Sequence, residues 1–162
     1  KSYVAKKAAE AYRGYPILDE LNSFAVEQGR ELEDEAIAFA ALEYGYKISK
    51  LGFCESDDGR SGCSPDGLIG DHSGIEMKCP RPATHVRYLV DGVLPKDYAA
   101  QVHGSMLITG RAEWVFFSYC RDLPPFHLLV KRDEAICAKI AEAIAAFATQ
   151  FDEVMHKLNI IK

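Results

Sequence analysis

The chain has 162 residues, of which 48% are hydrophobic and 27% are charged, and this balance is typical of one folded domain rather than of a disordered segment. Its net charge of −5 argues against a uniformly basic protein that coats nucleic acid. Because no apolar run approaches the roughly 18 residues of a membrane span and the first residues lack a signal-peptide core, we expect a single cytoplasmic domain over residues 1–162 without membrane contact.

The first predicted element is a helix over residues 29–44, with Gly45 as its stop. Most acids in its first turns suit solvent and the helix dipole. Glu33 differs because it falls in line with Ile37 and Ala41, at the edge of the apolar stripe. A carboxylate at that position could face a cleft. The stripe itself consists of four residues at helical spacing: Leu32, Ala36, Phe39 and Ala40.

Residues 46–79 consist of short apolar runs broken by Gly, Asp, Ser and Pro, which predicts three antiparallel strands and a polar loop near residues 55–62. The last two strands form a hairpin around the turn-rich residues 70–74. In its second strand, Glu76 and Lys78 point to one face and Ile75 and Met77 to the other. The hairpin carries Asp66 back towards Glu76 and Lys78.

Two carboxylates and an ammonium group close together suit the metal-assisted cleavage of a phosphodiester. Hard cations such as Mg²⁺ prefer oxygen ligands, so Asp66, Glu76 and the backbone carbonyl of Met77 are candidate ligands. Lys78 could hold or deprotonate the attacking water, or neutralise charge on the phosphoryl group. Two metal ions would activate the water and stabilise the leaving oxygen. A Glu-x-Lys pair alone is common on solvated faces, but Pro65-Asp66-Gly67 ahead of it on the same hairpin favours a site.

Pro80 and Pro82 end this strand, and a connecting region leads to a helix from residues 95–97 to Gly110. Aromatic and β-branched residues predict a buried strand over 113–119 and a partner strand over 127–131. An amphipathic helix over residues 133–158 completes the pattern. The expected fold is therefore α/β, with a central mixed β-sheet flanked by helices. Three residues of the helix that ends at Gly110 share one face: Tyr98, Gln101 and Ser105.

The segment from Ser64-Pro65-Asp66-Gly67-Leu68 to Gly74-Ile75-Glu76-Met77-Lys78-Cys79-Pro80 resembles the nuclease motif of the phage lambda exonuclease (YqaJ-type viral recombinase) family. This family is a branch of the PD-(D/E)xK nucleases. The likeness extends to residues 29–36 and 98–102, and with the α-β-β-β-α-β order it spans roughly residues 29–119.

The resemblance implies that Asp66 and Glu76 bind Mg²⁺ ions, two in number and replaceable by Mn²⁺, and that Lys78 is the catalytic lysine. Glu33 would be the acid near the metals, and Gln101 would support the metal site or the scissile strand. DNA contacts are expected from Tyr98 and Ser64. Family members degrade one strand of linear double-stranded DNA from its 5′ end. They form a homotrimeric ring and pass the 3′ tail to a single-strand annealing protein in phage recombination within the bacterial host.

The family usually begins with a segment that holds an arginine-containing phosphate pocket for the 5′ end. Residues 1–15 do not match it clearly. If the segment is missing, the site that recognises the 5′ end is incomplete, and Arg13 is a weak substitute candidate. An endonuclease on the same fold is the main alternative, because internal cutting would need the same Asp66, Glu76 and Lys78. A non-catalytic, metal-stabilised DNA-binding module is disfavoured by the complete set of active-site residue types.

The cysteines and histidines are interpreted as structural. Five cysteines form an odd, scattered set, so reduced thiols are expected. A zinc site built from Cys54, Cys63, Cys79 and a histidine is disfavoured, because the gap between the first two matches no usual ligand spacing. His85 and His103 stand outside any cluster and are interpreted as surface or hydrogen-bonded residues.

Overall fold

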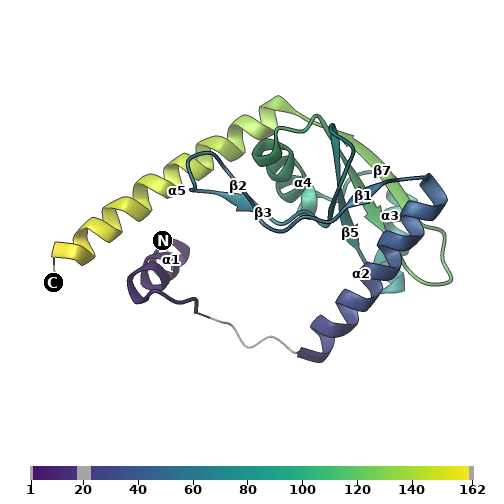
Figure 1. Cartoon of the computed structure of the whole chain (residues 1–162), viewed down its shortest axis with the longest axis horizontal. Helices are drawn as coiled ribbons and strands as arrows, with labels where there is room; N and C mark the ends of the chain where they lie inside the picture. Colours follow the sequence, from purple (N-terminus) through teal and green to yellow (C-terminus); the bar gives the residue numbers. More distant parts are fainter. Residues whose placement is uncertain (1, 18–22, 161–162) are drawn as a thin grey trace.

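The structure is a computed structural model that describes the backbone of residues 2–17 and 23–160 and the side chains of residues 3–17 and 32–159. Figure 1 shows the elements. The helices are α1 (Ser2–Arg13), α2 (Ser23–Tyr44), α3 (Pro82–Asp91), α4 (Lys96–Thr109) and α5 (Glu134–Ile160). The strands are β1 (Ile48–Ser49), β2 (Cys54–Glu55), β3 (Gly62–Cys63), β4 (Gly67–Ile69), β5 (Ser73–Lys78), β6 (Glu113–Ser118) and β7 (Phe126–Lys131).

A five-stranded mixed sheet lies at the centre of the fold, in the order β1-β4-β5-β6-β7. Strands β5 and β6 are parallel, and the other neighbours are antiparallel. The predicted mixed sheet is therefore confirmed. The predicted polar loop near residues 55–62 is instead the turn of a separate two-stranded sheet, β2–β3, which branches off between β1 and β4.

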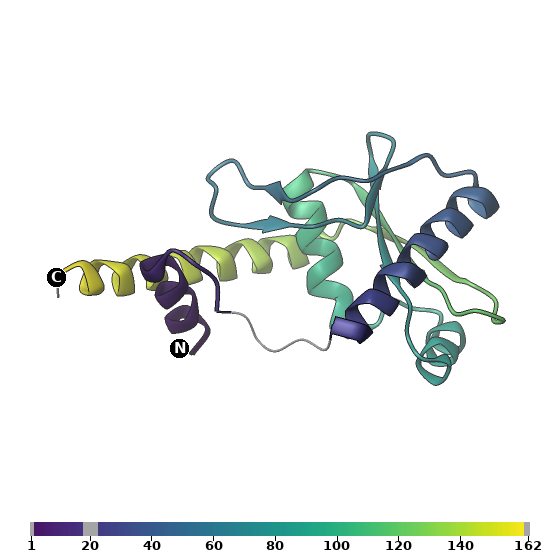
Figure 2. The ribbon, with the colours of Figure 1, turned by 60° about the horizontal axis from the view of Figure 1, so that its bottom comes forward.

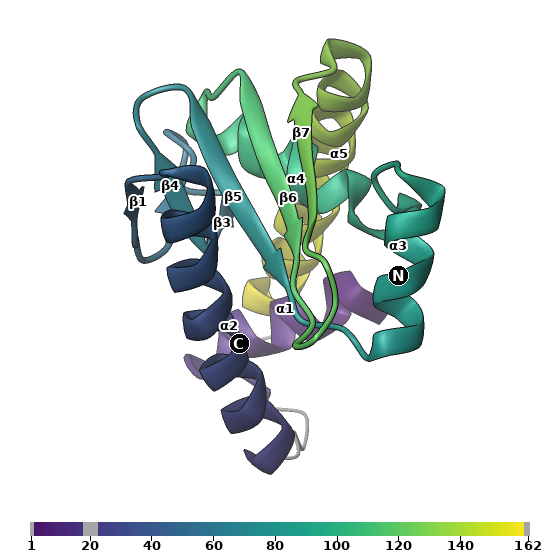
Figure 3. The same ribbon diagram turned by 90° about the vertical axis from the view of Figure 1, so that its right-hand side faces the viewer.

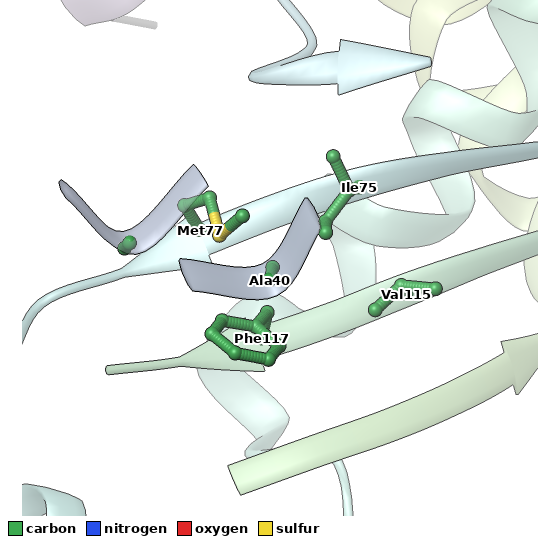
Figure 4. Packing of buried hydrophobic residues seen from close by; sticks show 6 residues of the cluster. Ala40, Ile75, Met77, Val115 and Phe117 are labelled. Atoms are coloured by element: carbon green, nitrogen blue, oxygen red, sulfur yellow. The ribbon is translucent and has the colours of Figure 1, made fainter. Parts of the chain in front are cut away.

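Helices cover both faces of the central sheet, with α2 on one face and α4 on the other (Figure 3). Successive residues of a strand point to opposite faces, so each central strand supplies both layers of the core. The α2 layer is built from Ala36, Ala40, Ile75, Met77, Val115 and Phe117, most of which are seen from close by in Figure 4. The α4 layer is built from Val102, Met106, Trp114, Phe116 and Phe126.

Gly74 allows the α4 layer to pack tightly against strand β5. It is the direct neighbour of Trp114 across the parallel β5–β6 pair. A Cβ atom on Gly74 would lie 2.3 Å from the indole ring of Trp114, which is itself fully buried. A glycine is therefore required at this position by close approach and not by its backbone conformation.

Helix α3 corrects the prediction that residues after Pro80 form only a connection. Pro82 occupies the first position of the helix, where its missing N–H removes no helical hydrogen bond. The N-cap residue, Arg81, has an extended backbone and makes no side-chain capping hydrogen bond. Its buried His85 holds α3 against the sheet. The Nε2–H group of His85 donates to the carbonyl of Pro124 (2.8 Å), so Nδ1 accepts from the hydroxyl of Ser118 (2.7 Å). The interpretation of His85 as a hydrogen-bonded residue is confirmed.

The terminal helices pack against each other. Helix α1, for which the sequence predicted no element, lies beside the distal half of α5 in Figures 1 and 2. The ring of Tyr3 lies 5.5 Å from that of Phe147. Helix α2 begins at Ser23, earlier than predicted, since Gly29 does not interrupt it. None of the helices in the part of the chain that the structure describes has a long enough apolar stretch to cross a membrane.

Candidate active site

The β4–β5 hairpin brings Asp66 back against strand β5, as the sequence predicted. Asp66 directly precedes β4, and its Oδ2 accepts a hydrogen bond from the backbone N–H of Met77 (2.6 Å). The next carbonyl along β5, that of Lys78, accepts instead from Tyr119 beyond the end of β6 (2.8 Å). Because backbone groups of successive residues point to opposite edges of a strand, the carbonyl of Met77 points to the same edge as Asp66.

Glu76 stands at the centre of the cluster. Its side chain is 2% exposed, and its Oε1 accepts hydrogen bonds from the ammonium group of Lys78 and from Nε2 of Gln101 (2.7 Å). The Lys78 Nζ atom lies 5.0 Å from the centre of the Tyr98 ring. Helix α4 carries both Tyr98 and Gln101, one turn apart, so one helix face positions the lysine and the carboxylate.

Glu33 reaches the cluster from the opposite face of the sheet. It lies on α2, and its carboxylate interacts electrostatically with Asp66 and Lys78. Lys50, which follows β1, also interacts electrostatically with Glu33 and Asp66 and forms an ion pair with Asp34. No local sequence pattern points to Lys50, because its place depends on the pairing of β1 with β4.

The negative charges of the carboxylates in the site are only partly neutralised by the nearby lysines. Burial, followed by repulsion from Asp66, raises the pKa of Glu76 to about 7, although Lys78 and Gln101 act in the other direction. Burial also raises the pKa of Asp66 and of Glu33, and in Glu33 repulsion from Asp66 adds to the effect. The cluster therefore holds more negative charge than its lysines neutralise, which is the electrostatic environment that a divalent cation relieves.

The oxygen ligands fit a hard cation. Within residues 3–17 and 32–159, the side-chain hydrogen bonds involve one oxygen of Glu76 and one of Asp66, so the second oxygen of each is available. No three His, Cys, Asp or Glu side chains of these residues are close enough to form a metal site by themselves. A cation here would depend on two carboxylates, a backbone carbonyl, water and phosphate.

A pocket of about 1160 Å³ opens beside the cluster. Gln101 and Ser64 lie in its wall, together with residues of the β2–β3 hairpin, α4, α5 and α1. Helix α1 contributes Lys7 to this wall, whereas Arg13 is not among the lining residues. Instead, the Arg13 guanidinium stacks on the ring of Tyr15 at 4.2 Å and is exposed. The described geometry therefore gives no support to Arg13 as a substitute phosphate ligand.

All predicted site residues except Arg13 thus lie at or beside one place. Hydrogen bonds join Glu76 to Lys78 and Gln101. Asp66 is bonded to the backbone of Met77 and interacts with Glu76 and Lys78 through charge. Glu33 interacts through charge, Tyr98 packs on the lysine, and Ser64 lines the adjoining pocket.

Several solved structures share this fold. The alkaline exonuclease LHK-Exo from Laribacter hongkongensis is 30% identical, with a TM-score of 0.87, and the match covers 98% of this chain and 82% of that chain. LHK-Exo in complex with dAMP is 31% identical, also with a TM-score of 0.87, over 97% and 82% of the two chains. A phage related exonuclease from Haemophilus somnus 129PT, with a TM-score of 0.74 over 97% and 82%, is 16% identical and supports the fold alone.

The sequence comparison agrees with the structural one. No curated protein matches the chain. Residues 1–112, in contrast, match the family model of the YqaJ-like viral recombinase domain, and they contain every candidate site residue. The chain therefore belongs to the YqaJ-like viral recombinase domain family.

Proposed function

We propose that this chain is a metal-dependent deoxyribonuclease that removes nucleotides from the 5′ end of one strand of linear double-stranded DNA and leaves a 3′ single-stranded tail. The observation that carries the proposal is the convergence of Asp66, Glu76, Lys78 and Gln101 on one buried point beside a pocket. Membership of the recombinase family and the likeness to an alkaline exonuclease support an exonuclease role. The dAMP complex of that relative supports a mononucleotide product.

Each residue of the site would have a separate role in metal binding, catalysis or positioning. Asp66, Glu76 and the Met77 carbonyl would hold Mg²⁺. The site would bind two such ions, and Mn²⁺ would replace Mg²⁺ as the bound cation. When bound, such ions lower the pKa of water and neutralise charge on the phosphate. The Lys78 ammonium would orient the attacking water or stabilise the phosphoryl oxygens by donating a hydrogen bond. Gln101 fixes the Glu76 carboxylate through its Nε2 donor, and Tyr98 limits the positions of Lys78.

Two assembly properties form part of the proposal through the family resemblance. The chain would form a homotrimeric ring around the duplex and pass the 3′ tail to a single-strand annealing protein in phage recombination. The ring is tested by the mass of the protein in solution, which light scattering measures directly. A monomer at all concentrations would contradict it.

An endonuclease with the same residues is the second candidate, and one experiment separates the two. Linear duplexes labelled at either 5′ or 3′ end, and covalently closed circular duplexes, are incubated with the protein with Mg²⁺ or with EDTA. We expect labelled mononucleotide from the 5′-labelled linear DNA, intact circles, and no product in EDTA. Internal fragments from circles would establish the endonuclease, and DNA binding without any product would establish the non-catalytic module.

A further inference from the structure

Two cysteines face each other across the small β2–β3 sheet. Cys54 and Cys63 are direct partners in this antiparallel pair, and Glu55 and Gly62 form the next pair. Both cysteines are half-buried while Glu55 and Gly62 are exposed, so the two thiols lie on the same inner face of the hairpin. Opposed residues of antiparallel strands have Cα atoms about 4.5–5.5 Å apart. This spacing lies within the range of about 4.4–6.8 Å that a disulfide requires.

The two thiols also interact with each other. The pKa of the Cys63 thiol is raised, first by burial and then by its electrostatic interaction with Cys54, whereas Ser105 acts in the other direction. Ser105 lies on α4, one turn from Gln101 of the catalytic cluster. Cys63 itself lines the pocket beside that cluster. One member of the thiol pair, Cys63, therefore lies in the pocket wall, and strand pairing sets Cys54 opposite it.

We propose that Cys54 and Cys63 form a reversible oxidation site, which a small disulfide such as oxidised glutathione converts into an intramolecular disulfide. One cysteine thiolate attacks the reagent disulfide, forming a mixed disulfide and releasing one glutathione thiolate. The thiolate of the second cysteine then attacks the sulfur of the first and releases the second glutathione. The protein loses two electrons and two protons, and one glutathione disulfide becomes two glutathione thiols.

The disulfide would restrain the β2–β3 hairpin, which forms part of the pocket wall. Strand pairing already sets the register of Cys54 and Cys63, so closure requires no strand to move. The closed loop contains the turn that carries Arg60, whose guanidinium bonds both carboxylate oxygens of Asp152 on α5 at 2.8 Å. The disulfide would therefore hold this turn in the position in which it meets α5. The proposal does not depend on nuclease activity.

A competing pair exists at the far ends of β5 and β6. Cys79 lies close enough to Cys120 for their charges to interact. The register of the parallel β5–β6 pair, in which Lys78 faces Ser118, nevertheless leaves Cys120 one residue out of step with Cys79, so the two are not direct partners as Cys54 and Cys63 are. Cys120 is half-buried, as Cys54 and Cys63 are, and is therefore a matched control.

The sequence permits a direct test by peptide mapping. Trypsin cleavage after Lys50, Arg60 and Lys78 places Cys54 in residues 51–60 and Cys63 in residues 61–78. The full chain is incubated with oxidised glutathione, its remaining thiols are blocked with iodoacetamide, and it is denatured and digested without reductant. We expect these two peptides as one linked species, which dithiothreitol separates.

Matched variants decide the outcome. Cys120→Ser should leave the yield of the linked species unchanged. Cys54→Ser should abolish it and leave Cys63 alkylated or joined to glutathione. The proposal is overturned if residues 51–60 and 61–78 stay unlinked in oxidised glutathione free of the reduced form, or if residues 112–121, which contain Cys120, form the main linked species instead.

Discussion

Glu76 carries the largest electrostatic cost among the residues of the site. Its carboxyl is buried, and its pKa of about 7 lies above the ordinary value of 4.5. The folded protein therefore binds more protons than the unfolded chain between these two pH values. The contribution of Glu76 to stability is fully present below pH 4.5 and is lost as the pH rises through about 7.

Glu76→Gln should therefore stabilise the protein at alkaline pH in the absence of metal. In EDTA at pH 8, we expect the variant to exceed the wild type in free energy of unfolding by on the order of 2–3 kcal/mol. The gain should shrink to near zero below pH 4.5. Urea titrations at several pH values measure this, and an equal difference at pH 5 and pH 8 would contradict the assigned cause.

Lys50 should keep the neighbouring acids charged. It lowers the pKa of both Glu33 and Asp66, so Lys50→Gln should raise both and move the onset of Mg²⁺ binding to higher pH. Calorimetric titration with Mg²⁺ across a pH series measures the onset. Lys47→Gln is the matched control, since Lys47 is also exposed but is not among the groups that act on these carboxylates. An equal effect of both changes would remove Lys50 from the site.

Gln101 should act by positioning Glu76. Gln101→Ala removes the donor at 2.7 Å from Oε1, and loss of such support costs about 10–100-fold in metal affinity or activity. The same change at Gln150, which is exposed on α5, should have no effect. Mg²⁺ affinity from calorimetry and the cleavage rate should fall together. A fall in rate at unchanged metal affinity would assign Gln101 to the DNA instead.

At the level of elements, the closest packing contact is that of strand β5, at Gly74, with the indole ring of Trp114. Gly74→Ala should destabilise the fold by about 1–3 kcal/mol, because the new methyl group would overlap the indole ring. Trp114 is the one tryptophan of the sequence, so its fluorescence reports unfolding directly. Gly104→Ala on α4, where a Cβ meets nothing within 4 Å, should be neutral or slightly stabilising. Equal losses in both variants would contradict the packing argument.

Local patterns predicted the hairpin of the candidate active site well. Alternation in β5 separated Glu76 and Lys78 from Ile75 and Met77, and the turn after β4 fixed the return of the chain. Helix α3 was missed because Pro82 was interpreted as a stop, although proline also suits the first position of a helix. The short sheet β2–β3 was missed because strands of two residues carry little periodicity.

At the scale of the whole molecule, the parts that sequence could not predict are those set by distant contacts. The parallel pairing of β5 with β6 joins residues 40 positions apart, such as Ser73 and Glu113, and has no local signature. The packing of α1 on α5, which forms one side of the pocket, joins residues that are even farther apart in the sequence. The net charge of −5 likewise gave no hint that the acids would gather around Glu76, since a total does not show a distribution.

The whole-molecule charge also bears on substrate binding. A protein with this net charge should bind duplex DNA through a small number of local cations, so its affinity should fall with salt less steeply than that of a basic DNA-coating protein. Fluorescence anisotropy with labelled duplex in EDTA, over a range of NaCl concentrations, gives the slope. A slope typical of many phosphate contacts would show that a larger cationic surface forms, as a ring of subunits could provide.

The role of this cluster as an active site is tested by the cleavage of 5′-labelled linear duplex in Mg²⁺ by the wild type and by Lys78→Ala. We expect mononucleotide release by the wild type, a loss of about 10²–10³-fold or more in the variant, and DNA binding in EDTA that differs little between the two. Cleavage by Lys78→Ala near the wild-type rate would contradict the assignment of this cluster as the active site.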